Sequence, residues 1–223
     1  MPLVSTFPDR RAAGRALARA VALRHLPDPV VLALPRGGVP VAFEVAQELG
    51  APLDLVMVRK IGAPGHSEYA IGAIVDGDDP EVVIDRTIAA ASGASQTYIT
   101  QQIDASLKEI RRRRAAYGVG ASIDLAGRTA IVVDDGVATG STVMVALKAV
   151  RKARPRRIVL AVPVAPADTF SKLRPYCDEI ICLLKPRDFY AVGAYYDQFG
   201  QTSDAEVVRY LELSRSFAKH AGR

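Results

Sequence analysis

The chain has 223 residues, of which 49% are hydrophobic, and a formal net charge of +5. This length suits one well-buried domain, and no apolar run approaches the roughly 20 residues of a membrane-spanning helix. The N-terminus has no basic segment followed by an apolar one, and Cys177 and Cys182 have no metal ligands beside them in the sequence. We therefore expect a cytoplasmic protein with reduced thiols and no membrane partner. The positive charge alone does not choose between an anionic small molecule and nucleic acid.

The N-terminal region predicts a helix, a strand, a glycine turn and a second helix. Pro8 and Asp9 open an Ala/Arg-rich segment with apolar residues at helical spacing, and we expect its arginines to be solvent-exposed. Residues 30–34 are typical of a buried strand, and Pro-Arg-Gly-Gly-Val-Pro at 35–40 leads into a helix ending near Leu49. A turn after a parallel strand lies at the edge where open α/β sheets bind ligands. Taken alone, this turn is equally consistent with an ordinary connection.

The next segment predicts a strand at 53–58 that ends in Arg59 and Lys60. Residues 61–70 are rich in glycine and proline, so we expect them to form an irregular, flexible lid loop. Arg59 and Lys60 are then either surface charges or cations placed to meet an anion. Two short strands should follow around a turn at 76–80, namely 71–75 and 82–84.

Residues 92–117 predict a long amphipathic helix with isoleucine or leucine at 99, 103, 107 and 110. Four arginines follow at 111–114, where cations suit the negative end of the helix dipole. Consecutive helical residues spread around the axis, so these arginines do not form one stripe for nucleic acid. We expect the helix to form a lobe or a dimer contact.

Residues 130–142, Ala-Ile-Val-Val-Asp-Asp-Gly-Val-Ala-Thr-Gly-Ser-Thr, are the most informative stretch. Four apolar residues end in Asp134 and Asp135, and after a turn of small residues an apolar helical pattern begins. The amides of residues 138–142 can converge on one anion, because the first turn of a helix leaves its N–H groups unpaired. Two carboxylates suit sugar hydroxyls or a hydrated Mg²⁺. The stretch therefore predicts a receptor for a sugar phosphate, although glycine turns and acidic pairs are each common by themselves.

The C-terminal third predicts two strands with a short helix between them, at 157–163, 168–174 and 180–184. Residues 185–197 then gather aromatic and charged side chains directly after a strand. Rings there could stack on a planar base while Lys185 and Asp197 read its polar edge; an ordinary packed loop is the alternative. Ser203 should cap a final helix.

The order of apolar run, Asp-Asp, Gly-x-Ala-Thr-Gly-x-Thr and helix closely resembles the 5-phosphoribosyl-1-pyrophosphate (PRPP) motif of the type I phosphoribosyltransferases. Beside it, residues 35–40 resemble the family's pyrophosphate loop, which often carries a non-proline cis peptide. Residues 185–197 are similar to the purine-binding hood of hypoxanthine–guanine enzymes. The whole arrangement most resembles a branch of bacterial phosphoribosyltransferases whose acceptor is unassigned.

This resemblance implies an α/β fold, in which a central, mostly parallel twisted sheet is flanked by helices. It also implies one domain over residues 1–223, with a core at about 28–85 and 125–184, a flexible lid loop, a helical insertion at about 87–118 and a hood at about 185–202. Family members are commonly homodimers, so we expect one here. Nucleic acid is not an expected partner.

The implied activity is transfer of ribose 5-phosphate from Mg²⁺-bound PRPP to a purine-like base, with release of pyrophosphate. Asp134, Asp135, Arg36 and Lys60 are then the catalytic residues, and the two aspartates also meet Mg²⁺, the one expected cofactor. The remaining PRPP-binding residues are Gly37, Gly38, Arg59, Gly136, Val137, Ala138, Thr139, Gly140, Ser141 and Thr142. The base-binding residues are Lys185, Tyr190, Ala191 and Asp197.

Ala138 departs from the pattern of the 6-oxopurine enzymes, in which this position supplies an aspartate that handles a proton of the purine. The hood thus favours an oxopurine and the turn does not. A non-catalytic regulator that senses PRPP or a nucleotide stays open, as does a related reaction such as nucleotide phosphorolysis. Arg36, Arg59 and Lys60 favour an enzyme, because sensing needs less machinery for a leaving group.

Overall fold

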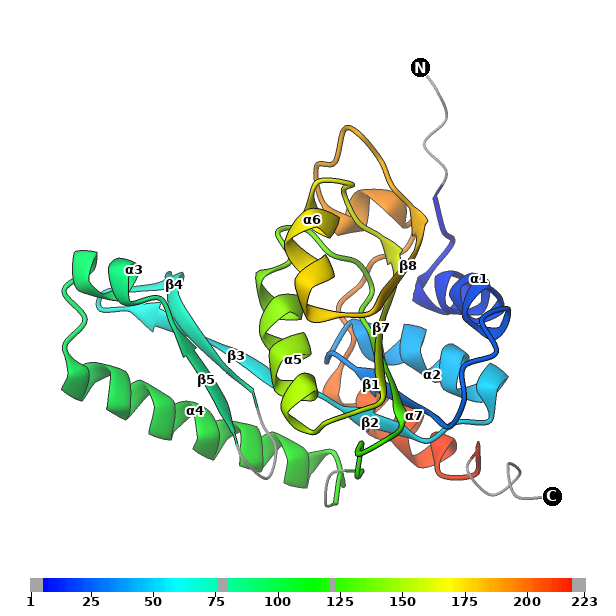
Figure 1. Ribbon diagram of the computed structural model, residues 1–223, viewed down its shortest axis with the longest axis horizontal. Coiled ribbons are helices and arrows are strands. Elements are labelled where there is room, and N and C mark those ends of the chain that lie inside the picture. Colours follow the sequence, from blue (N-terminus) through cyan, green and yellow to red (C-terminus); the bar gives the residue numbers. More distant parts are fainter. Residues whose placement is uncertain (1–5, 76–79, 121–122, 218–223) are drawn as a thin grey trace.

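The computed structural model describes residues 6–75, 80–120 and 123–217 (Figure 1). Residues 76–79 of the expected turn lie outside these ranges. Among the helices that the structure describes, none has the length and apolarity needed to cross a bilayer. The elements in chain order are α1 (Arg10–Ala22), β1 (Pro29–Ala33), α2 (Gly38–Leu49), β2 (Leu53–Leu55), β3 (Val58–Ala63), β4 (His66–Val75), β5 (Glu81–Ile84), α3 (Arg86–Ala91), α4 (Gln96–Ala116), β6 (Thr129–Val133), α5 (Ser141–Lys152), β7 (Arg157–Val164), α6 (Thr169–Leu173), η1 (Arg174–Tyr176), β8 (Glu179–Leu184), η2 (Val192–Tyr195) and α7 (Asp204–Ser214).

Five strands form a parallel sheet in the order β2-β1-β6-β7-β8. Strands β1 and β6 are neighbours, and their register runs from Pro29 opposite Thr129 to Ala33 opposite Val133. Both strands therefore end at the same level of the sheet, and the loops that follow them start side by side. The expectation of a mostly parallel sheet flanked by helices is confirmed.

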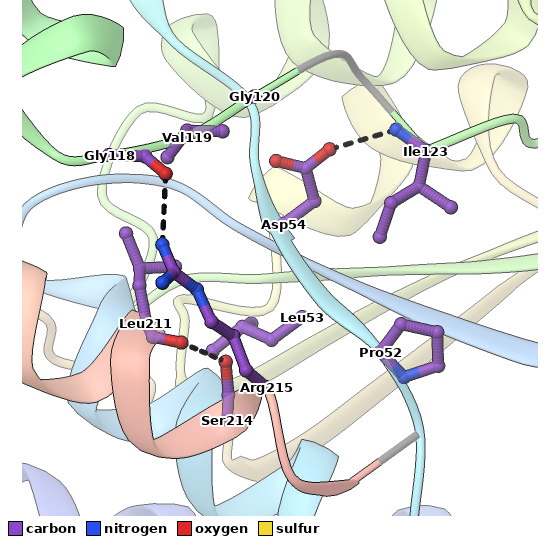
Figure 2. Close-up of a pocket in the computed structure, with 10 residues that line it drawn as sticks. All are labelled: Pro52, Leu53, Asp54, Gly118, Val119, Gly120, Ile123, Leu211, Ser214 and Arg215. Atoms are coloured by element: carbon purple, nitrogen blue, oxygen red, sulfur yellow. Dashed lines mark hydrogen bonds between the residues drawn. The ribbon is translucent and has the colours of Figure 1, made fainter. Parts of the chain in front are cut away.

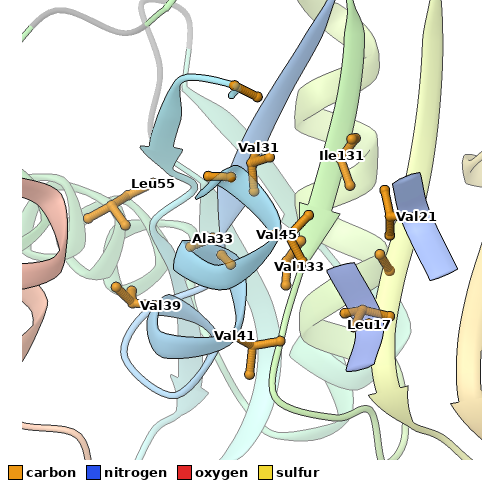
Figure 3. Close-up of a cluster of buried hydrophobic side chains, with 14 of the residues drawn as sticks. Leu17, Val21, Val31, Ala33, Val39, Val41, Val45, Leu55, Ile131 and Val133 are labelled. Atoms are coloured by element: carbon orange, nitrogen blue, oxygen red, sulfur yellow. The ribbon is translucent and has the colours of Figure 1, made fainter. Parts of the chain in front are cut away.

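Alternate residues of the strands pack into two apolar layers, one on each face of the sheet. In β6, Ile131 and Val133 point toward the layer that contains α1, α2 and α7, whereas Ala130 and Val132 point toward α5 and α6. Figure 3 shows the first layer, where Leu17 of α1 and Val41 of α2 lie over the strands. Both faces are buried, so the strand sequences are continuous apolar runs rather than alternating ones.

The remaining strands form a separate antiparallel sheet, β3-β4-β5. We call β3, β4, β5, α3 and α4 the arm; Figure 1 shows it extending sideways from the region of α5. The long helix expected at 92–117 is α4, capped by Ser95. A separate apolar cluster holds the arm together, and its buried members are Ile61, Ala63, Ile71, Ala89 and Ile99.

The expected irregular lid at 61–70 is wrong. These residues form a β-hairpin in which β3 and β4 pair antiparallel and only Pro64 and Gly65 lie between the strands. Gly65 has a φ of +74°, which lets the chain reverse. The strand expected at 53–58 is also shorter than predicted, because β2 ends at Leu55. Arg59 and Lys60 consequently lie within β3 of the arm and do not end a strand of the parallel sheet.

Candidate functional site

Two loops meet at the carboxyl edge of the parallel sheet, one after β1 and one after β6. The Leu34 amide donates to the Val133 carbonyl at 2.9 Å. A Cβ on Gly38 would lie 2.8 Å from that same carbonyl oxygen and 3.0 Å from the Asp134 Cα, and a Cβ on Gly37 would collide with the Asp135 carboxylate. Only glycine allows this approach. The structure thus brings Gly37 and Gly38 directly against the acidic pair, and the peptide bond before Arg36 is cis.

Helix α5 presents an uncapped N-terminus to this junction. Its first intrahelical bond runs from the Met144 amide to the Gly140 carbonyl (2.8 Å), and Gly140, at φ +80°, provides no side-chain cap. By contrast, α1, α3, α4 and α7 are each capped by an aspartate or serine side chain. Among the described residues, no capping side chain accepts from the amides of residues 141–143, so these amides are available to a bound anion. Thr139 and Ser141 add exposed hydroxyls beside them.

The two adjacent carboxylates of this junction are both buried, and burial makes each of them costly to ionise. Asp134 accepts the Asp135 amide at 2.9 Å through Oδ1. Burial raises the pKa of Asp134 well above its usual range, and the neighbouring Asp135 charge adds to the effect. Burial also raises the pKa of Asp135, although the Arg10 guanidinium opposes that shift. Even with Arg10 beside Asp135, the native state therefore holds the ionised pair at an electrostatic cost when no metal ion is bound.

Arg10 is a component of the site that the sequence did not identify. Its Nε donates to Asp135 Oδ2 at 2.8 Å, its Nη1 donates to the Gly200 carbonyl at 2.6 Å, and its Cζ lies 3.9 Å from the centre of the Phe199 ring. Only 12% of its side chain is exposed. The expectation that the N-terminal arginines are simply solvent-exposed is therefore wrong for Arg10. No local signal marks it, because its partner is 125 positions away.

The hood, residues 185–202, borders the loop after β6. A Cβ on Gly136 would lie 2.5 Å from Val192 Cγ1, and the Tyr196 hydroxyl donates to the Asp135 carbonyl at 2.5 Å. On the other side of the loop, the Thr169 hydroxyl donates to the Ala138 carbonyl at 2.8 Å. The sequence gives no local signal for Tyr196 or Thr169 either, because each side chain reaches this loop only through the fold.

The four expected base-binding residues all lie in the hood, in different environments. The Lys185 ammonium lies 5.5 Å from the centre of the Phe170 ring, and Asp197 accepts the Thr6 hydroxyl at 2.8 Å. Tyr190 is 95% exposed, and Ala191 is exposed beside it. Their contact with a base stays a prediction.

The expected cations separate into two groups. Arg36 Nη1 lies 3.5 Å from Asp204 Oδ1, and the Tyr117 hydroxyl donates to that same oxygen at 2.7 Å. Arg36 is thus held at the loop after β1. Arg59 Nη1 instead lies 3.7 Å from Glu109 Oε1 on α4, and Lys60 is exposed on β3.

The donor set fits Mg²⁺ that arrives with a phosphorylated ligand. The described residues contain no cluster of three or more His, Cys, Asp or Glu side chains that could hold an ion by themselves. Mg²⁺ commonly takes one or two carboxylates and completes its shell with water and substrate phosphates. Asp134 and Asp135 supply that number of carboxylates, and one oxygen of Asp135 is already engaged by Arg10.

A cavity of about 240 Å³ lies elsewhere, where β2, residues 118–120, Ile123 and the end of α7 meet (Figure 2). Asp54 accepts the Leu55 and Ile123 amides, and Arg215 donates to the Gly118 carbonyl at 3.1 Å. These polar groups join chain segments to one another. The cavity borders the amino end of β2, whereas α/β sheets bind ligands at the carboxyl ends of their strands.

A family model and two curated relatives both link this chain to phosphoribosyl transferases. The model of the phosphoribosyl transferase domain matches residues 8–199. Two Mycobacterium tuberculosis proteins, named "Putative phosphoribosyl transferase" in strains CDC 1551 / Oshkosh and ATCC 25618 / H37Rv, are 43% identical over 215 residues, or 96% of this chain and 48% of theirs. The chain thus spans about half the length of these curated relatives. The crystal structure of TT1426 from Thermus thermophilus is similar with 44% identity and a TM-score of 0.78, over 92% of this chain and 97% of that one.

Proposed function

The chain belongs to the phosphoribosyl transferase domain family, and we propose that it transfers ribose 5-phosphate from Mg²⁺-bound PRPP to a nitrogen of a purine-like nucleobase, releasing pyrophosphate. One observation carries this proposal: Gly37 and Gly38 touch the acidic pair beside the uncapped N-terminus of α5. Donors for a phosphate, acceptors for a sugar and a second glycine loop are thereby joined at one edge of the sheet.

Each part of the site has a role in this reaction. The amides and hydroxyls of residues 138–142 bind the 5-phosphate, and Asp134 and Asp135 accept the ribose hydroxyls. The C1–oxygen bond to pyrophosphate breaks while a ring nitrogen of the base forms its bond to C1. Arg36 and the amides around Gly37 stabilise the charge that develops on the departing pyrophosphate. Mg²⁺ held by Asp134 and Asp135 would neutralise part of that charge.

The hood supplies the acceptor side. Tyr190 exposes a ring that can stack on a planar base, and Lys185 and Asp197 offer a donor and an acceptor for its edge. Ala138 cannot take the proton that the base releases, so that proton passes to another group or to water. A purine-like acceptor that loses its proton easily suits this arrangement best.

A second candidate is a regulator on the same fold that senses PRPP or a nucleotide without turnover. The position of Arg59 favours it, because this cation lies beside Glu109 in the arm rather than beside the acidic pair. Lys60 is exposed on the same strand. With Arg59 and Lys60 on β3 of the arm, only Arg36 of the three expected cations lies at the loop after β1, which leaves less machinery for expelling pyrophosphate.

Titration calorimetry with Mg²⁺-PRPP tests the binding role. The double change Asp134→Asn, Asp135→Asn should weaken affinity at least about tenfold, because charge-assisted hydrogen bonds to the ribose are lost. Asp104→Asn, on the exposed face of α4, is the matched control and should bind as the wild type does. Equal affinity of the double variant and the wild type would contradict the assigned role.

Pyrophosphate release across a panel of nucleobases separates the two candidates. An enzyme releases pyrophosphate with at least one base, and we expect the purines to be the active class. A protein that binds Mg²⁺-PRPP and turns over none of the bases is the regulator. A steep salt-dependent affinity for RNA would then support a regulatory partner.

A further inference from the structure

Residues 6–10 form a strap that fastens the hood to the body of the molecule. The Phe7 amide donates to the Tyr195 carbonyl at 2.8 Å, the Asp197 amide to the Phe7 carbonyl at 2.9 Å and the Gln198 amide to the Pro8 carbonyl at 3.0 Å. The rings of Phe7 and Tyr196 pack at 5.7 Å between centroids. The strap and residues 195–198 therefore behave as one hydrogen-bonded unit.

Arg10, at the end of the strap, reaches both sides of the proposed site. Its guanidinium donates to Asp135 on the loop after β6 and to the Gly200 carbonyl at the end of the hood, while the Phe199 ring covers its face. Arginine presents several donors in a rigid plane, so one side chain fixes the two acceptors relative to each other. With 12% of Arg10 and 14% of Asp135 exposed, water competes little for these bonds.

A second contact runs parallel to this one. The Tyr196 hydroxyl donates to the main-chain carbonyl of Asp135 at 2.5 Å, so the loop is tied to the hood through both its side chain and its backbone. Gly37 lies against the same Asp135 carboxylate. The loop after β1, the loop after β6 and the hood thus converge on Asp135.

We propose that Arg10 is a positioning residue that couples the hood to the carboxylate pair, so that a phosphoribosyl ligand at residues 134–142 also orders the hood over the acceptor. This inference rests on the proposed function. A ligand that fixes Asp135 fixes the guanidinium, and the guanidinium fixes Gly200 and the strap. The two halves of the site then close as one unit, which is the condition for positive coupling between sugar phosphate and base.

Hydrogen exchange measured by mass spectrometry, with and without Mg²⁺-PRPP, tests the coupling. The Asp197 and Gln198 amides report directly on contact between the strap and the hood. In the wild type, Mg²⁺-PRPP should slow their exchange at least about fivefold, the lower end of typical coupling between sites, and should also protect residues 134–142. In Arg10→Met, protection should persist at residues 134–142 and disappear from the hood.

Two further variants complete the design. Arg10→Lys keeps the charge without the planar fork and should recover part of the hood protection. If Arg10→Met does not fold, Arg10→Lys serves as the test in its place, and full wild-type protection of the hood in Arg10→Lys would overturn the coupling. Arg24→Met removes an arginine that pairs with Glu179 at 2.7 Å beyond the opposite end of α1, and it should behave as the wild type.

The outcomes separate the two levels of inference. Hood protection that survives in Arg10→Met, or wild-type protection confined to residues 134–142, overturns the coupling and leaves the proposed function standing. Absence of protection anywhere in the wild type overturns the proposed function and the coupling with it. Hood protection that depends on Arg10 supports both.

Discussion

Asp134 lies beneath Gly38 with a second carboxylate beside it, and burial raises its pKa well above the ordinary range. A carboxyl with a raised folded-state pKa destabilises the native state as pH rises from the unfolded pKa, about 3.9, through the folded value. Measured without Mg²⁺ or ligand, Asp134→Asn should therefore raise the free energy of unfolding at neutral pH by about 1–3 kcal/mol. Asn keeps an oxygen for the Asp135 amide, so the hydrogen bond at that position can persist.

Urea denaturation at acidic and neutral pH checks this expectation. The advantage of Asn should shrink toward pH 4, because the wild-type carboxyl is then protonated and also neutral. Asp104→Asn, at an exposed position of α4, is the control for exchanging an aspartate for an asparagine. A variant less stable than the wild type at neutral pH would mean that the carboxylate contributes favourable contacts that exceed its burial cost.

Among single residues, the sequence identifies those site residues whose motif partners are close neighbours in the chain. Asp134, Gly140 and Thr139 stand within a few positions of one another, so a strand, a turn and a helix start can be read together. Arg10 could not be found this way, since it contacts Asp135 only after α1 packs on the sheet and the hood folds over it. An arginine in an Ala/Arg-rich helix looks the same whether its side chain ends in solvent or on a buried acid.

Among the elements, the end of α4 and the start of α7 are joined by a hydrogen bond that also touches the site. Tyr117 donates to Asp204 at 2.7 Å, and Arg36 lies 3.5 Å from the same oxygen. Burial raises the pKa of Tyr117 to about 12, and the bond to Asp204 adds to the shift. A raised folded-state pKa means that the contribution of Tyr117 is fully present below its unfolded pKa, about 10, and is lost as pH rises toward 12.

Tyr117→Phe should accordingly lower the free energy of unfolding by about 1 kcal/mol at pH 8, the usual net value of one hydrogen bond. Its stability should also fall less steeply than that of the wild type between pH 10 and 12. Tyr69→Phe is the control, because Tyr69 is 57% exposed on β4. Denaturant titrations across this range compare the three proteins, and parallel pH curves for Tyr117→Phe and the wild type would contradict the assignment.

The elements also show why sequence patterns succeed or fail. Helix α5 has a continuous apolar face, with Val143, Leu147 and Val150 buried. The helical spacing of these apolar residues is enough to predict the helix from the sequence. The hairpin at 61–70 has no such period, because Gly62 is a strand residue paired with Ala70. Further along β4, a Cβ on Gly72 would collide with the Val83 carbonyl of β5. Glycines that serve strand pairing look like glycines of a loop until the partner strand is known.

At the scale of the whole molecule, the apolar residues divide between the sheet and the arm. Ile71 belongs to the cluster of the arm, whereas Ala73 and Val75, further along β4, pack in a cluster of the parallel sheet. The other end of the arm is fixed as well, since Ile110 and Tyr117 join the sheet cluster beneath α1 and α2. The part of the arm around Ile71 therefore depends on fewer contacts with the rest of the molecule.

Local opening of the arm follows from this division. Ile71→Ala removes a fully buried side chain and should cost about 2–5 kcal/mol, mostly within β3, β4 and β5. Native-state hydrogen exchange should show faster exchange of the amides near Ile71 while those of β1 and β6 remain protected. Val132→Ala, in the centre of the parallel sheet, is the matched comparison and should speed exchange throughout the chain. Uniform loss of protection in Ile71→Ala would show that arm and sheet unfold as one cooperative unit. If the arm opens alone, Mg²⁺-PRPP should bind Ile71→Ala as it binds the wild type, because the proposed sugar-phosphate contacts at residues 134–142 lie between β6 and the first turn of α5, outside the arm.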